Sequence, residues 1–168
     1  EITYGDWSSD VCSSDLGGAL FGLNPTPGKL NPMVPLVELR GRILQVRDLA
    51  AGETIAANRT PPAKTPMRLA VISVGHADGY PRPASETDHG LQAIVGGQLC
   101  PLVGSVSTDF LTVDVTGLKN PRAASRGEMV TLIGGTIDID TLAAAAQTTG
   151  YELLTNISRR IHRVYFAN

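Results

Sequence analysis

The sequence predicts a mainly β, barrel-like domain with one or two short helices near its carboxy-terminal end. Three observations support this class. Short runs rich in Val, Ile and Leu recur along the chain and are separated by Gly and Pro turn signals. Some of these runs alternate apolar and polar residues, as in Leu-Thr-Val-Asp-Val at 111–115. Only the stretch 138–150 combines a high alanine content with clear start and stop signals for a helix.

The expected strands can be placed from these runs. The long run at 34–49 alternates imperfectly near Gly41, which predicts a bulge or bend in one long strand. The pair Gly96-Gly97 is typical of a two-residue hairpin turn. The remaining expected strands are residues 68–74, 91–95, 98–106, 111–115, 129–133 and 159–166.

The helical elements are expected late in the chain. An Asp side chain can accept a hydrogen bond from the first turn of a helix, so Asp138 or Asp140 is the expected start. A glycine commonly ends a helix, so Gly150 is the expected stop. Residues 151–158 predict a second, shorter helix.

Length and composition fit a single soluble domain. A chain of 168 residues with 42% hydrophobic residues can bury one sizeable core. No apolar run approaches the roughly 20 residues of a membrane-spanning helix, and the net charge of −2 does not indicate nucleic-acid binding. The cysteines Cys12 and Cys100 and the three histidines are scattered. We therefore expect no metal site, no disulfide framework and a reducing, cytoplasmic location.

Residues 1–16 differ in composition from the rest of the chain. They contain four acidic residues and no basic residue, and they repeat the motif SSDV as SSDL. A flexible acidic tail would have this composition. The stretch DWSSDVCSSDL also resembles the translation of a sequencing-library adapter, so we expect residues 1–16 to be a non-native, adapter-derived tail.

Several motifs occur in the order in which they stand in the carboxy-terminal part of alanine racemases. These motifs are LFGLNP, GETI, VGHADGYPR, VGSVSTDFLTVDVT, RGEMVTLIGG and a final segment that begins DTLAAAAQTTGYELLTNI. The resemblance implies a family in which an amino-terminal (β/α)8 barrel binds pyridoxal 5′-phosphate and a β domain follows it. Residues 17–32 would then be the end of that barrel and a connector. Residues 33–168 would be the carboxy-terminal β domain of a chain truncated at its amino terminus.

The lysines test whether this chain could hold the cofactor by itself. Pyridoxal phosphate chemistry of this kind needs a desolvated lysine that forms a Schiff base. The chain has three lysines, and Lys29, Lys64 and Lys119 all stand among Pro, Gly or Asn in expected loops. We therefore expect no cofactor-binding residue in this chain. Pyridoxal 5′-phosphate would be bound by the missing amino-terminal barrel.

The resemblance implies one catalytic position and one substrate-binding segment. The family's catalytic tyrosine is donated by the partner subunit's β domain, and its position matches His76. The family's SMD segment lines the substrate entrance from the same subunit and matches residues 107–109. In this chain Thr108 replaces the usual methionine. We expect Thr108 and Asp109 to bind the substrate.

His76 is an unusual residue at the position of the second catalytic base. An imidazole, with an ordinary pKa near ~6.5, is a better base at pH 7 than a phenol near ~10. Its far nitrogen lies roughly 2 Å closer to the backbone, and a misplacement of about 1 Å can cost on the order of a hundredfold in rate. We therefore expect an otherwise intact enzyme with His76 to be slow, or biased toward one direction. The alternative is a loop histidine produced by a sequence error.

Other polar residues have simpler interpretations. Asp78 followed by Gly79 is typical of a turn fixed by an Asx-type hydrogen bond. The basic residues at 159–163 are expected to be surface or interface residues on an alternating strand. His89 has no evident partner.

The leading hypothesis is the carboxy-terminal part of a pyridoxal-phosphate-dependent alanine racemase that supplies D-alanine for peptidoglycan. It would act as a homodimer, because the second base must come across a two-fold interface. The fragment alone would be inactive, and the missing barrel would leave an apolar face exposed. Two alternatives stay open. One is a non-catalytic dimerisation or ligand-binding β module, and the other is a racemase of another small amino acid such as serine.

Overall fold

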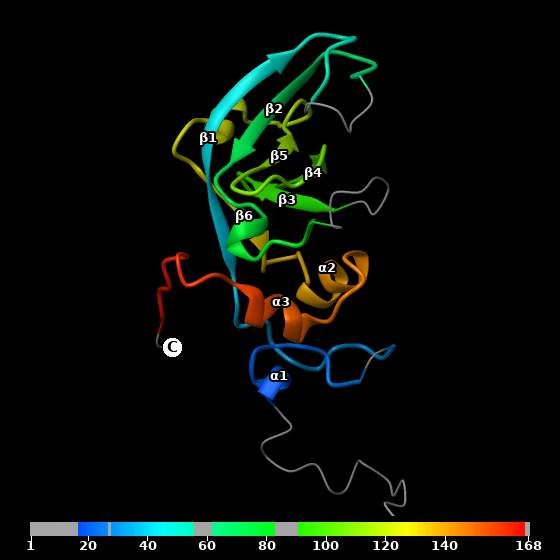
Figure 1. Cartoon of the computed structure of the whole chain (residues 1–168), viewed down its shortest axis with the longest axis vertical. Coiled ribbons are helices and arrows are strands. Elements are labelled where there is room, and N and C mark those ends of the chain that lie inside the picture. Colours follow the sequence, from blue (N-terminus) through cyan, green and yellow to red (C-terminus); the bar gives the residue numbers. More distant parts are fainter. Residues whose placement is uncertain (1–16, 27, 56–61, 83–90, 167–168) are drawn as a thin grey trace, which may run out of the picture.

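Six antiparallel strands close into a barrel in the order β1-β2-β5-β4-β3-β6 (Figure 1). The computed structural model describes residues 17–26, 28–55, 62–82 and 91–166. The expected mainly β, barrel-like fold is confirmed. Most strands occur where the sequence predicts them, although some are shorter. The strands are β1 (Leu39–Leu49), β2 (Met67–Ile72), β3 (Gln92–Val95), β4 (Gln98–Val103), β5 (Leu111–Asp114) and β6 (Met129–Ile133).

The barrel closes because β1 is long enough to pair with two neighbours. The first residues of β1 pair with β6, and its last residues pair with β2. The register shifts once in each half of this pairing, on either side of Gly41. This confirms the irregularity expected near that glycine. Each shift increases the local bend, and the bend lets one strand serve both sides of a closed barrel.

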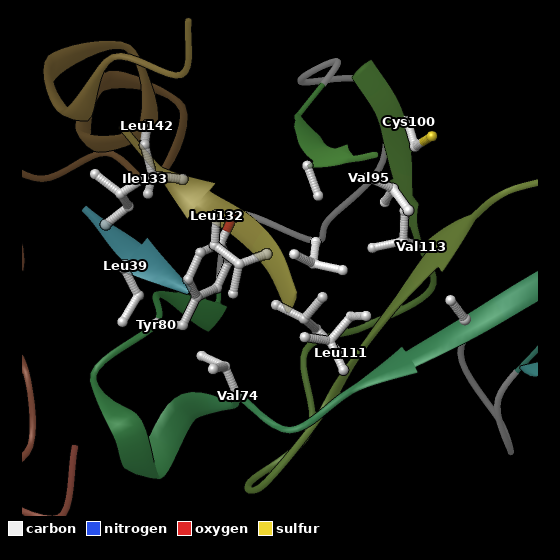
Figure 2. Packing of buried hydrophobic residues seen from close by; sticks show 14 of the residues in the cluster. Leu39, Val74, Tyr80, Val95, Cys100, Leu111, Val113, Leu132, Ile133 and Leu142 are labelled. Carbon is white, nitrogen blue, oxygen red and sulfur yellow. The ribbon is translucent and has the colours of Figure 1, made fainter. Parts of the chain in front are cut away.

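Aliphatic side chains fill the barrel interior. In β5, Leu111 and Val113 are buried whereas the residues between and after them are only half-buried, as the alternating pattern predicts. Leu132 of β6 is fully buried as well. Figure 2 shows these side chains together with Tyr80, which enters the same core from the loop after β2. Full burial of one such side chain contributes about 1.5–3 kcal/mol, so this cluster is the main source of stability.

Two helices, α2 (Ile139–Ala145) and α3 (Gly150–Asn156), pack together at one end of the barrel (Figure 1). Asp138 begins α2, because its side chain accepts the N–H of Thr141 at 3.1 Å. This confirms one of the two expected starts. The short helix α1 (Gly17–Leu20) lies beyond α2 and α3 in Figure 1.

The expected helix stop at Gly150 is wrong. Helix α2 ends at Ala145, and Gly150 instead begins α3, with Thr149 accepting the N–H of Glu152 as the cap. The reason is that Gln147, with a φ of 55°, takes the left-handed conformation that commonly follows the end of a helix. Gly150 serves a close approach instead, since an added Cβ atom would lie 2.5 Å from the Cδ2 atom of Leu23.

The expected strand at 159–166 is also wrong. These residues follow α3 as an irregular segment with no strand pairing. A strand needs a neighbour with unpaired backbone groups, and the closed barrel offers no free edge. The alternating apolar and basic residues of this segment are therefore not enough to make it a strand.

Three further observations concern the part of the chain that the structure describes. None of its helices combines the length and the apolar character needed to cross a lipid bilayer. None of its groups of His, Cys, Asp and Glu side chains could hold a metal ion. Cys100 is buried and forms no disulfide. Residues 1–16, with Cys12, and His89 lie outside the described residues.

Candidate functional site

A short 3₁₀ turn, η1 (His76–Asp78), follows β2 and presents His76 at the surface. The turn begins after Gly75, and its end is closed by the N–H of Gly79, which donates to the carbonyl of His76 at 3.0 Å. Tyr80 then returns to the core and is 1% exposed. His76 is therefore an exposed side chain on a turn whose two ends are both anchored in the barrel.

Backbone hydrogen bonds join this turn to the segment before β5. The N–H of His76 donates to the carbonyl of Ser107 at 2.9 Å. The N–H of Ala77 donates to the carbonyl of Thr108 at 2.8 Å. The structure thus brings together two segments that the sequence analysis singled out separately.

Gly75 allows these two segments to touch. A Cβ atom at Gly75 would lie 2.5 Å from the carbonyl oxygen of Thr108 and 2.6 Å from the backbone nitrogen of Asp109. Both are backbone atoms, which cannot move aside as the end of a side chain could. Both Thr108 and Asp109 have exposed side chains, as His76 has. The three expected site residues consequently stand on two touching backbone segments, and their side chains are exposed.

Asp78 carries the buried charge of this region, since it is only 4% exposed. Its Oδ2 atom accepts the N–H of Gly75 at 2.9 Å, and its Oδ1 atom accepts Nε–H of Arg160 at 2.6 Å. Burial opposes ionisation of this carboxyl. The hydrogen bonds from Arg160 and Gly75, together with the charge of Arg160, nevertheless lower the pKa of Asp78 below its ordinary value. Asp78 does fix the turn, but through a bond back to Gly75 instead of the expected Asx-type bond.

Arg160 is the site residue that sequence reasoning missed. Its Nη2 atom donates to Oδ1 of Asp109 at 2.9 Å, in addition to the bond to Asp78. These two carboxylates raise the pKa of Arg160 above its ordinary value. The alternating pattern at 159–163 predicts only ordinary surface or interface residues on a strand. The signal in the sequence that could reveal Arg160 is Asp78. A carboxylate that becomes buried beside a core tyrosine needs a cation as its partner.

A cavity of about 410 Å³ lies between η1 and the helices α2 and α3. Thr108 and Asp109 are not among the described residues that line it. The polar side chains in its lining come from His76, Arg82, Gln147, Thr148, Glu152 and Asn156.

Comparison with known proteins decides the family. Residues 36–165 match the family model described as "Alanine racemase, C-terminal domain". The chain belongs to this family. The resemblance seen in the sequence motifs is therefore confirmed, and the barrel with its few short helices is the fold of an alanine racemase C-terminal domain.

Curated alanine racemases are similar to most of this chain. The alanine racemase of Methylobacterium sp. (strain 4-46) is 49% identical over 149 residues, which are 89% of this chain and 40% of the relative. That of Acidiphilium cryptum (strain JF-5) is 46% identical over 148 residues, or 88% of this chain and 40% of the relative. The chain thus spans about two fifths of the length of these relatives.

Solved alanine racemase structures share the fold. The biosynthetic alanine racemase from Pseudomonas aeruginosa is 34% identical with a TM-score of 0.80, covering 90% of this chain and 41% of that chain. The alanine racemase from Bartonella henselae, solved with covalently bound pyridoxal phosphate, is 31% identical with a TM-score of 0.80. The match covers 89% of this chain and 40% of the Bartonella henselae chain.

The lysines of this chain do not fit a covalently bound pyridoxal phosphate. Lys29, Lys64 and Lys119 are all exposed in the structure. A Schiff-base lysine must be desolvated to be reactive at neutral pH, and an exposed ammonium is not. The part of the chain that the structure describes therefore offers no lysine suited to the cofactor.

Proposed function

We propose that this chain is the carboxy-terminal part of a pyridoxal-phosphate-dependent racemase that interconverts L- and D-alanine. Residues 33–168 form its β domain, residues 17–32 are the end of the cofactor-binding barrel with a connector, and residues 1–16 are not native. The names of the relatives support the reaction, and the Bartonella henselae structure supports the cofactor. The product would serve peptidoglycan synthesis in the cytoplasm.

His76 is the proposed proton-transfer residue of this domain. Racemisation removes a proton from one face of the substrate α-carbon and delivers a proton to the other, so two groups must face each other across the substrate. The observation that carries the proposal is the placement of His76. It is exposed, it stands on an anchored turn and it borders a cavity of about 410 Å³. The resemblance of the motif VGHADGYPR adds that this position would be that of the family's catalytic tyrosine.

Thr108 and Asp109 are the proposed substrate-binding residues. Their support is the direct contact between their segment and the His76 turn. A hydroxyl and a carboxylate beside the proton-transfer group could orient an amino acid by its polar ends. The residue that holds the cofactor would belong to the barrel of an identical subunit, so the proposed active form is a homodimer.

A fusion protein tests this function. Residues 17–168 would be joined to the amino-terminal part of the Methylobacterium racemase, and the interconversion of L- and D-alanine followed in both directions. We expect slow racemisation, and an increase in kcat of about tenfold or more for His76→Tyr, because the phenol restores the reach of the base. His76→Ala should lower kcat on the order of a hundredfold.

The exposed His162 offers a matched control, and His162→Ala should leave the rate unchanged. A fusion protein that binds the cofactor but racemises neither alanine nor serine would contradict the function. Serine turned over faster than alanine would identify a serine racemase. An active enzyme that is indifferent to His76→Ala would contradict the role of His76.

A further inference from the structure

We propose that Arg160 is a positioning residue that holds the His76 turn and the Thr108–Asp109 segment in one fixed arrangement. The proposal rests on the proposed function and adds to it the group that orients the proton-transfer side chain. Arg160 itself need not touch the substrate, because it acts through the two carboxylates that it binds.

The guanidinium of Arg160 connects two segments of the chain. Its Nε atom lies 2.6 Å from Oδ1 of Asp78, and its Nη2 atom lies 2.9 Å from Oδ1 of Asp109. A guanidinium is planar and rigid, so two bonds from one fork fix the separation of the two carboxylates. A lysine could not do this in the same way, because its ammonium is a single point of charge.

Asp78, held in place by Arg160, in turn fixes the backbone around His76. It closes the same 3₁₀ turn that His76 begins, and its second oxygen accepts the N–H of Gly75 at 2.9 Å. The carboxylate held by Arg160 therefore fixes the backbone on both sides of His76. A fixed backbone restricts the directions that the His76 side chain can take, since the allowed rotamers depend on the φ and ψ angles of the residue.

The segment that follows α3 places Arg160 beside the His76 turn. The N–H of Ser158 donates to the carbonyl of Asp78 at 3.0 Å. The N–H of Arg160 in turn donates to the hydroxyl of Ser158 at 3.3 Å. The segment after α3 is thus attached to the turn by its backbone as well as by the guanidinium.

The side chains of Asp78 and Arg160 are buried to different degrees, and this decides whether charge attraction or directional hydrogen bonding dominates the interaction. The side chain of Asp78 is 6% exposed, whereas that of Arg160 is 49% exposed. Solvent screens the attraction of a half-exposed cation, so net charge attraction is the weaker part of its contribution. The directional hydrogen bonds to the buried carboxylate are the stronger part.

Amide hydrogen exchange on the 168-residue chain tests the positioning without relying on any activity. In Arg160→Met, we expect the N–H groups of Gly75, His76 and Ala77 to exchange about tenfold faster or more, because the turn opens locally. Arg40 forms a 2.7 Å pair with Glu38 away from this site, so Arg40→Met is the matched control. Unchanged protection of the turn in Arg160→Met would overturn the proposal.

Kinetics of the fusion protein test the consequence for proton transfer. We expect Arg160→Met to lower kcat by roughly 10- to 100-fold, because the base is misplaced, and to raise KM by about a few-fold, because Asp109 of the proposed substrate-binding segment loses its partner as well. Arg160→Lys should recover part of kcat, and Arg40→Met should change neither constant. An unchanged kcat with a raised KM would contradict positioning of the base. An inactive parent fusion would refute the proposed function, and the exchange result would still decide whether Arg160 holds the turn.

Discussion

The Nε atom of Arg160 lies 2.6 Å from Oδ1 of Asp78, although 82 positions separate the two residues in the chain. This bond links the turn after β2 to the segment after α3, and a second bond from Arg160 adds the segment before β5 through Asp109. Three stretches that are distant in sequence therefore meet around one guanidinium. The proposed proton-transfer residue, His76, stands on the first of them.

The buried carboxylate makes stability depend on pH in a defined direction. The pKa of folded Asp78 lies below its ordinary value of 3.8, so folding favours the ionised form. Its contribution is fully present above the pKa of the unfolded state and is lost as the pH falls through the pKa of the folded state. We expect the difference in unfolding free energy between the wild type and Asp78→Asn to be constant near neutrality and to shrink below about pH 4.

Urea unfolding at a series of pH values would measure this difference. The difference between the two unfolding free energies cancels the contribution of the carboxyl groups that both proteins contain. A difference of the same size at about pH 6 and about pH 3 would show that Asp78 has no lowered pKa.

Gly75→Ala should separate the two segments of the site. The added methyl group would meet backbone atoms of Thr108 and Asp109 at 2.5 and 2.6 Å, and the extended φ of −143° shows that crowding, not backbone strain, is the cause. We expect a loss of about 1–3 kcal/mol in the free energy of unfolding.

Gly117→Ala is the control for this change, because no atom lies within 4 Å of its added Cβ. Thermal or urea unfolding of both variants would give the comparison. Equal stabilities for the two would mean that the segments are farther apart than the structure has them.

Pyridoxal phosphate added to this chain should not form a stoichiometric covalent adduct. Lys29, Lys64 and Lys119 are exposed, and solvated amines react weakly and without selectivity. Borohydride reduction followed by mass spectrometry of the peptides would count the labelled lysines. We expect partial labelling spread over all three. One equivalent of cofactor trapped on a single lysine of this chain would refute the proposal that the barrel holds the cofactor.

The amino-terminal segment should promote self-association. Several apolar side chains between α1 and β1 face solvent, and Leu30 is 94% exposed. Clustered exposed apolar groups favour contacts between molecules. We expect sedimentation velocity to show concentration-dependent association that Leu30→Ser with Leu36→Ser reduces. Leu44→Ser, on the barrel surface, should not reduce it.

Much of the barrel could be predicted from local patterns. Period-two alternation places β5, because alternate residues of a strand face the core and the outside. The pair Gly96-Gly97 does join β3 to β4, and Asp138 does cap α2. These features depend on neighbours within a few residues, so the sequence contains the information directly.

The closure of the barrel and the composition of the site depend on contacts between distant segments. Residues 159–166 alternate as a strand would, yet the closed barrel leaves them no partner to pair with. The sequence pattern therefore predicts the wrong kind of element for Arg160, and only the contacts with Asp78 and Asp109 indicate its role. Local side-chain periodicity specifies the strands. The cation that pairs with the buried Asp78 carboxylate lies 82 positions away, so only the folded chain determines this contact.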